Sequence, residues 1–349
     1  MDKTKVKKAK VIKEKKKFPW AKIGYYLKTL ISNDRVVEVG STVKWYWTAL
    51  LFLVSIGLAM IPLTVHTFET RGSSYITNSS YSDSYYLGLQ AYVNDETAPD
   101  IVFNLPEGGE NTATIDGAIE SDRVFVYRRN VSDGTDATSR LTFTIYFTDD
   151  NNFDSIRENI VANDVDGNTR NSSFILFGSS RFYSQAYSSG TNRQPYTMSG
   201  DYAHFKNLTK DNETSISFKN YLSQPYEGFE ALSQDAIFNN YSIIADTIYI
   251  NNRNMMTGIY SGISLGVNGG LILLMGVILF LMTRSKNNPY KQAKWYKFIG
   301  MSIWAGFTPA ILTLALGFAL AGGYELMIFI FAFGFRGMWL SMRQLRPSV

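Results

Sequence analysis

The sequence contains no cysteine, and this absence excludes several classes of protein at once. No disulfide can stabilise the fold, and no thiol nucleophile, cysteine-ligated metal or Cys-x-x-Cys redox site is possible. Histidine is almost absent too, because His66 and His204 are the only two in the chain. A histidine zinc site or a Ser-His-Asp triad would have to be built around one of them. We expect His66, which follows a hydrophobic run, at a membrane interface, and His204 in a surface or packing role.

Motifs for nucleotide binding, hydrolysis and calcium binding are missing as well. The chain has no Walker phosphate loop, no Gly-x-Gly-x-x-Gly after a strand, no His-Glu-x-x-His, and no Gly-x-Ser-x-Gly elbow at a strand-to-helix turn. Asp150, Asn152 and Asp154 have the spacing that begins a calcium loop. Ser155 replaces the required glycine, however, and Val161 replaces the closing glutamate. The sequence therefore predicts an Asx-rich turn here, without a metal. Because the motifs above are missing, it also predicts no cofactor and no enzymatic activity for the chain.

Four long apolar stretches dominate what the sequence does contain. Because about 20 apolar residues cross a bilayer, these stretches predict four transmembrane helices, over residues 45–66, 257–283, 297–321 and 324–341. Trp45, Tyr46 and Trp47 begin the first stretch and are typical of an aromatic belt at a membrane interface. That stretch and the basic region before it are both too long for a cleavable signal peptide. The predicted fold class is an α-helical membrane protein with a separate domain, residues 67–256, inserted between its first two spans.

Positive charge is concentrated on one side of these spans. Residues 1–44 carry thirteen Lys or Arg against four Asp or Glu, and the loop 284–296 and the tail 342–349 are basic without any acidic residue. Because loops rich in Lys and Arg stay in the cytoplasm, both termini are predicted to be cytoplasmic and residues 67–256 extracytoplasmic. A basic region that ends where a hydrophobic helix begins is expected to face anionic lipid rather than nucleic acid. Within it, residues 18–32 have the composition of an interfacial helix.

The inserted segment is predicted to be a β-rich α+β domain. Its apolar and polar residues alternate with the period of half-buried strands in four segments, 122–129, 139–150, 172–180 and 212–221. Residues 152–164 predict a short helix, and residues 228–256 predict a helix that leads into the second span. A cysteine-free domain of this size is typical of a Gram-positive surface, so the expected location is a bacterial plasma membrane.

A tyrosine-rich run, residues 73–92, is the one stretch of this domain that suggests a ligand. Tyrosine rings can stack on sugars, and they can equally line a polar sheet. The candidate sugar contacts are Tyr81, Tyr85 and Tyr86.

The few polar or small residues inside the spans are the candidates for helix packing or for contact with a partner. The second span carries no charge, and Asn268 is its one strongly polar residue. Its glycines form a small-residue face that favours close helix packing over a substrate path: Gly262, Gly266, Gly269, Gly270 and Gly276. Arg336 lies about three-quarters of the way along the fourth span, where it can snorkel to the cytoplasmic face or contact a partner. Glu325 belongs to the outer turn before that span.

Residues 288–312, "NPYKQAKWYKFIGMSIWAGFTPAIL", carry a family resemblance. Tyr290, Lys291 and Gln292 precede Trp295, and Pro309 follows within the next apolar helix. With the long insertion after the first span, this pattern resembles a family of Gram-positive membrane proteins that includes the MalA-like maltodextrin-utilisation proteins and is distantly similar to Yip1-type proteins. The resemblance implies a non-enzymatic accessory role near sugar uptake, beside an ABC-type importer. Lysines and a tryptophan at this place also suit the cytoplasmic end of a span, and a proline within it can kink the helix.

Three functional hypotheses therefore stand. The first is an accessory or regulatory membrane protein that associates with importer subunits through its spans and presents the inserted domain to a sugar or a sugar-binding protein. The second is a stand-alone sensor or carbohydrate-binding membrane protein of the cell envelope. The third is an envelope enzyme with a carboxylate pair that meets only in the folded chain.

Overall fold

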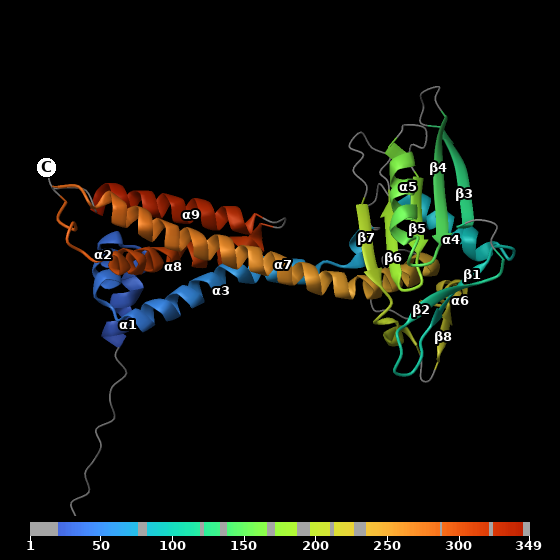
Figure 1. Ribbon diagram of the computed structural model, residues 1–349, viewed down its shortest axis with the longest axis horizontal. Helices are drawn as coiled ribbons and strands as arrows, with labels where there is room; N and C mark the ends of the chain where they lie inside the picture. Colours follow the sequence, from blue (N-terminus) through green and yellow to red (C-terminus); the bar gives the residue numbers. More distant parts are fainter. Residues whose placement is uncertain are drawn as a thin grey trace, which may run out of the picture. The chain divides into compact units, whose positions relative to one another are not determined.

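The computed structural model describes residues 20–75, 82–118, 122–132, 138–165, 172–186, 196–209, 213–226, 235–286, 288–320 and 324–344. The chain divides into two compact units (Figure 1). The helical unit comprises Met1–Thr64 and Ser261–Val349, and the β-rich unit comprises Val65–Tyr260.

Four helices in the described part of the chain are long and apolar enough to cross a membrane, as the sequence predicts. They are α3 (Trp45–Glu69), α7 (Ala236–Met282), α8 (Trp295–Ala319) and the segment Glu325–Met342, which contains α9 (Glu325–Trp339) and the start of the π-helical turn η4 (Leu340–Gln344). At 1.5 Å per residue the 47 residues of α7 extend for about 70 Å. A hydrocarbon core is about 30 Å thick, so only part of α7 can lie within a bilayer.

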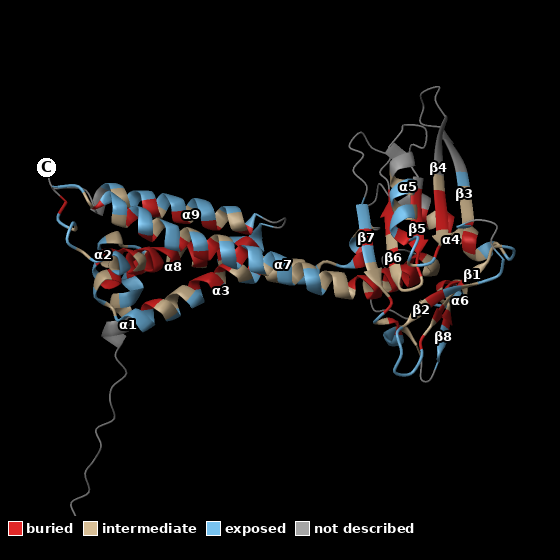
Figure 2. Ribbon diagram, in the orientation of Figure 1, coloured by how far each residue is buried: buried red, intermediate tan, exposed pale blue. Residues whose placement is uncertain are grey.

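The helix α8 is the centre of the helical unit (Figure 2). In its most apolar stretch 56% of the residues are buried, against 28% for each of the other three helices. The exposed faces of those three helices are themselves apolar, with Leu53, Leu274 and Phe331 among their exposed side chains. Such faces suit a lipid environment and not water.

The N-terminal region adds a second helix that the sequence did not predict. The expected helix over 18–32 is present in its described part as α1 (Trp20–Leu27) and the 3₁₀ turn η1 (Lys28–Leu30). It is followed by α2 (Asn33–Thr42), at whose start the Ser32 hydroxyl accepts a hydrogen bond from the Arg35 N–H.

Two glycines allow α2 to pack directly on α8. A Cβ added to Gly40 would lie 2.6 Å from the Met301 Cα, and one added to Gly300 would lie 2.4 Å from the Gly40 carbonyl oxygen. No side chain fits at such a backbone crossing. The N-terminal region is therefore part of the helical core, in which Val36 and Val39 are fully buried.

The β-rich unit contains two sheets (Figure 1). The larger has the strand order β3-β4-β5-β6-β7, with bounds Arg123–Ser132, Thr138–Phe147, Ser172–Phe177, Arg181–Ala186 and Tyr196–Asp201. The smaller has the order β2-β1-β8, with bounds Thr112–Asp116, Asp100–Asn104 and Ser215–Ser217. All neighbours are antiparallel except β4 and β5, which are parallel and joined through the helix α5 (Phe153–Val165).

Helices cover both faces of the larger sheet, and the alternation of β5 shows why. Its Phe174 and Leu176 belong to the cluster formed with α5, whereas Ile175 and Phe177 belong to the main core. That core is completed by α4 (Ser82–Asn94), α6 (Phe218–Ser223) and the first half of α7. Period-two alternation with both faces apolar is the pattern of a sheet buried on two sides.

The structure confirms most of the predicted elements of this unit and corrects two. The strands β3, β4 and β5, the helix α5 and the helix leading into the second span are present. The described end of the tyrosine-rich run is a helix and not a strand, because residues 82–94 form α4, which packs on the larger sheet. The predicted strand 212–221 is short: Ser217 ends β8 and its hydroxyl accepts a hydrogen bond from the Asn220 N–H, which starts α6.

Candidate functional site

The outward face of α7 in the helical unit is lined with glycine. Gly262, Gly266 and Gly270 recur every four residues, which places them on one side of a helix. A Cβ added to any of the three would meet no atom of another described helix within 4 Å. On such a face a second helix could approach the α7 backbone closely.

The other two glycines predicted for packing lie against the chain's own helices. A Cβ on Gly269 would lie 3.1 Å from the Ile56 side chain of α3, and one on Gly276 would lie 2.9 Å from the Ile299 Cα of α8. The predicted glycine face is therefore two faces, one used inside the unit and one open to the outside.

Asn268 belongs to the inner face. It is buried, its Nδ2 donates a hydrogen bond to the Ser264 hydroxyl at 3.1 Å, and its Oδ1 has no hydrogen-bond partner among the described residues. Residues 262–266 match the pattern Gly-x-Ser-x-Gly of a nucleophile elbow. Ser264, however, is buried in the middle of α7. A nucleophile elbow needs an exposed hydroxyl at a strand-to-helix turn, so this serine does not form one.

Arg336 has its contacts within the chain, on the N-terminal region. Its Nη2 donates to the Thr29 carbonyl oxygen, and its Nε donates to the Asn33 Oδ1 at 3.3 Å. Its Nη1 is buried without a hydrogen-bond partner in the described residues. These hydrogen bonds are made within the chain, to the turn between α1 and α2, which neither alternative predicted. Contact of Arg336 with another protein stays a prediction.

Glu325, which the sequence places at the outer turn before the fourth span, is buried. It is the first residue of α9 and only 1% of its surface is exposed, because it packs beside Gly317 of α8. A carboxylate at the first turn of a helix is favoured by the helix dipole. We therefore assign Glu325 to helix packing.

The remaining candidates of residues 288–312 have structural roles. Tyr290 lies in the loop before α8, where its carbonyl oxygen accepts a hydrogen bond from Arg284 at 3.3 Å. Trp295 begins α8 and is 62% exposed, as an interfacial tryptophan should be. Pro309 is buried within α8, and the neighbouring Thr308 hydroxyl donates to the Leu30 carbonyl oxygen at 2.8 Å.

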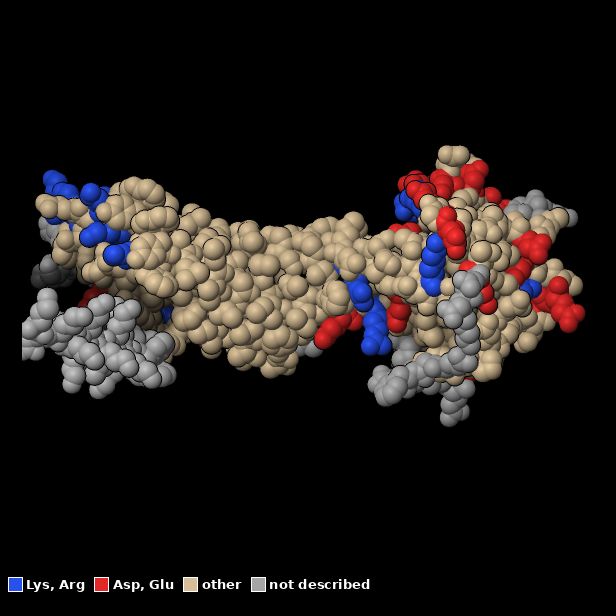
Figure 3. Space-filling model, turned by 90° about the horizontal axis from the view of Figure 1, so that it is seen from below, with Lys and Arg blue, Asp and Glu red and all other residues tan. Residues whose placement is uncertain are grey.

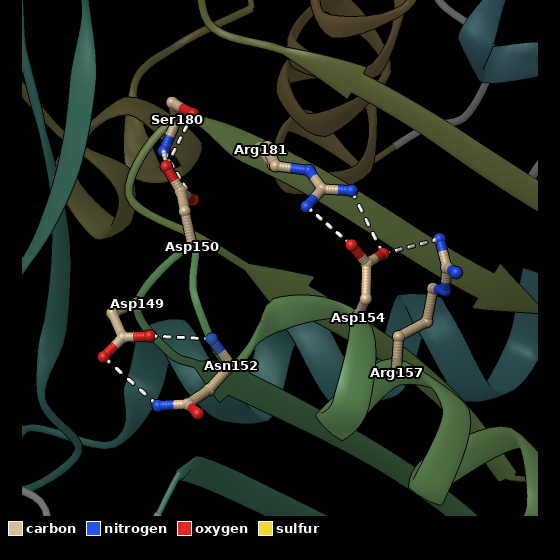
Figure 4. A network of polar contacts seen from close by, with 7 residues as sticks. All are labelled: Asp149, Asp150, Asn152, Asp154, Arg157, Ser180 and Arg181. Carbon is tan, nitrogen blue, oxygen red and sulfur yellow. Dashed lines mark hydrogen bonds and ion pairs between the residues drawn. The ribbon is translucent and has the colours of Figure 1, made fainter.

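The acidic stretch beside α5 forms structural contacts (Figure 4). Asp149 accepts hydrogen bonds from the Asn152 N–H and side-chain amide, as an Asx turn does. Asp150 points away from it and accepts from the Ser180 N–H and, at 2.6 Å, from the Ser180 hydroxyl. The carboxylates do not converge, and the described residues contain no group of three or more His, Cys, Asp or Glu that could hold a metal ion.

Asp154 of the same stretch is held by two arginines. Both of its oxygens accept from the Arg181 guanidinium, at 2.9 and 3.0 Å, and Arg157 lies 3.3 Å away. The hydrogen bonds from Arg181 hold the pKa of the Asp154 carboxyl below its usual value.

The structure removes Tyr85 from the candidate sugar contacts. This residue is fully buried in α4, and its hydroxyl donates to the Phe174 carbonyl oxygen at 3.0 Å. Burial raises its pKa, so it stays a neutral donor. Tyr86, one position along, is half-buried and its hydroxyl accepts from Gln90 at 3.3 Å. Tyr81 lies outside the described residues.

Neither histidine is arranged for catalysis. His204 contacts the Asn251 Oδ1 at 2.9 Å, and the Asn251 amide donates in turn to both oxygens of Asp201. Asp201 therefore does not bond the imidazole directly, as the carboxylate of a Ser-His-Asp triad does. His66 lies in the last turn of α3.

A groove in the β-rich unit was not predicted. It has a volume of about 310 Å³ and lies between β8, the loop before it and α6. Ser215, Asn220 and Tyr221 are among its lining residues. The turn between β8 and α6 forms this groove. The signal for that turn in the sequence is Ser217, a residue type that favours the start of a helix.

Charge is distributed unevenly over the helical unit (Figure 3). On the face shown, Lys and Arg gather at the end of the unit where α9 finishes, and a broad band without charged side chains follows along the helices. Such a distribution of charge is the one expected of a helix bundle that crosses a bilayer and ends at its headgroups.

The chain was compared with family models, with curated proteins and with solved structures, and no match was found in any of the three.

Proposed function

We propose that this chain is a non-enzymatic accessory protein of a bacterial plasma membrane. The loop 284–296 and residues 1–44 are on the cytoplasmic side, and the β-rich unit is on the outer side. The basic composition of both cytoplasmic segments supports this orientation, and the uncharged band of the helical unit supports insertion.

The protein associates with another membrane protein through the outward glycine face of α7. The observation that carries the proposal is that a Cβ at Gly262, Gly266 or Gly270 would meet no other described helix within 4 Å, whereas a Cβ at Gly269 or Gly276 of the same helix would press on α3 or α8. In lipid there is little hydrophobic drive for helices to associate, so close backbone approach at small residues is a main source of attraction. An open row of three such residues has the geometry of a helix-binding surface.

The partner is a subunit of an ABC-type sugar importer, as the resemblance of residues 288–312 to maltodextrin-utilisation proteins suggests. In this arrangement the β-rich unit stands beside the importer on the side where sugar or its binding protein arrives.

Co-purification from native membranes tests the association. We expect importer subunits to co-purify with a tagged chain. They should not co-purify with the double variant Gly262→Leu/Gly266→Leu, because two leucine side chains prevent a second helix from approaching the α7 backbone. Gly57→Leu is the matched control, since a Cβ at Gly57 on α3 also meets nothing within 4 Å but has no glycine row beside it. Recovery of the same subunits with the double variant would contradict the glycine face as the binding surface. Recovery of a second copy of this chain alone would contradict the importer.

A further inference from the structure

The groove of the β-rich unit follows the open edge of the smaller sheet. The strand order β2-β1-β8 leaves β8 at one edge, and the groove is lined by all three of its residues. At the opposite edge, the Ala113 N–H of β2 donates to the Ser179 carbonyl oxygen at 2.7 Å. Of the two edges, β8 is therefore the one that faces a cavity.

The backbone of Ser215 points into this groove. The Leu105 N–H donates to the Thr214 carbonyl oxygen at 2.7 Å, so Thr214 faces β1. Residues of an antiparallel strand alternate between bonding one neighbour and bonding the other. The N–H and C=O of Ser215 are consequently directed away from β1, next to each other on a strand edge, and no other described residue bonds them.

The side chains around that edge suit an extended peptide with a positive charge. Tyr221 and Pro225 provide apolar surface, and the Asn220 side chain can bond a main chain. Glu213 is exposed and is the only charged residue among the described residues that line the groove. The nearby Lys219 does not neutralise it, since the Lys219 ammonium donates to the Asp95 and Ala98 carbonyl oxygens at 2.6 and 2.5 Å.

We propose that the β-rich unit binds an extended segment of a partner polypeptide by strand addition to β8, with a Lys or Arg of that segment beside Glu213. Main-chain hydrogen bonds to Ser215 give affinity, and the carboxylate gives preference for a basic residue. Three residues of strand are about 10 Å long, so the contact recognises a short motif. The volume of about 310 Å³ is at the small end of ligand sites, which are about 300–1,000 Å³.

Peptide binding to the full-length purified chain tests this site. The probe is a fluorescein-labelled octapeptide, Ser-Thr-Val-Lys-Val-Thr-Ser-Gly, with two relatives that carry Ala or Glu in place of Lys, read by fluorescence polarisation. We expect affinity to fall in the order Lys, Ala, Glu. A Lys peptide N-methylated at alternate amides should bind about tenfold or more weakly, because it lacks the N–H donors along the edge that would pair with β8.

Variants of the chain separate strand addition from other binding. Ser215→Pro removes the outward N–H from an edge position that tolerates proline, and we expect it to abolish binding. Glu213→Gln keeps binding but removes the difference between the Lys and Ala peptides, whereas Glu107→Gln, an exposed acid outside the groove, preserves it. Equal binding of the N-methylated peptide would overturn the proposal. So would binding by Ser215→Pro, or displacement of the probe by maltoheptaose, which would assign the groove to a sugar.

Discussion

Arg336 fastens the N-terminal region to α9, and its removal has a measurable consequence. The guanidinium donates to the Thr29 carbonyl oxygen and to the Asn33 side chain, which lie on either side of the turn between α1 and α2. A hydrogen bond from a charged donor contributes about 1.5–3 kcal/mol. Because Arg336 is only partly buried, we take about 3 kcal/mol for both bonds together. Arg336→Leu should then raise the equilibrium constant for local opening of this region about 150-fold.

Limited trypsin digestion of the purified chain in detergent reads this opening. Cleavage after Lys28 and Arg35 follows the population of the open form when opening and closing are fast. We expect Arg336→Leu to accelerate both cleavages strongly. Arg336→Lys should have an intermediate effect, because an ammonium retains the charge but not the guanidinium geometry. Cleavage after Lys291, an exposed residue of the loop 284–296 that is unchanged in every variant, serves as the internal reference.

Lys294→Leu is the control variant, since Lys294 is an exposed cation just before α8. It should leave cleavage after Arg35 unchanged. If Arg336→Leu leaves the rates at both N-terminal positions within about twofold of wild type, the two hydrogen bonds do not hold the region, and the reasoning is refuted.

Three further predictions concern topology and the β-rich unit. The chain has no cysteine, so in intact cells an impermeant maleimide should label Glu107→Cys and not Lys294→Cys; the reverse pattern would invert the proposed orientation. Gly88→Ala should destabilise the β-rich unit by about 1–3 kcal/mol in thermal unfolding, because the new Cβ would lie 2.3 Å from a phenylalanine ring of β4; an unchanged midpoint would contradict this. The Arg181 guanidinium lowers the pKa of Asp154 in the folded protein. The ion pair therefore stabilises the fold above the pKa of Asp154 in the unfolded chain, about 4. This stabilisation is lost as the pH falls through the pKa of the folded state. Asp154→Asn should therefore lower the midpoint temperature of thermal unfolding at pH 7. If the variant's midpoint stays below that of wild type by the same amount on acidification, the ion pair is not the cause.

The elements predictable from the sequence are those whose burial pattern is local. The strand β5 and the helix α5 carry their period within a few residues. The composition of α4 did not predict a helix, because its Ser and Tyr residues suggest a loop or an edge strand. Tyr85, Leu89 and Tyr92 nevertheless recur at helical spacing, and all three are buried.

The contacts that the sequence could not give join residues far apart in the chain. Arg336 bonds Thr29, 307 positions away, and β8 pairs with β1 across more than a hundred residues. No local pattern encodes such pairings. For the same reason the division of the α7 glycines into an inner and an outer face required the positions of α3 and α8.

The shared helix α7 also sets an order on biosynthesis. Its first half supplies Tyr241, Ile244 and Ile248 to the main core of the β-rich unit, and these residues are made after every described strand. The nascent chain therefore holds the eight described strands with an incomplete core from the end of β8 until about residue 250 has been synthesised. At about 5–20 residues per second that interval lasts roughly 2–7 seconds. Exposed strand edges in such a chain are prone to aggregate. Folding of the β-rich unit is thus coupled to production of the second apolar helix, which follows its last core residues without a break.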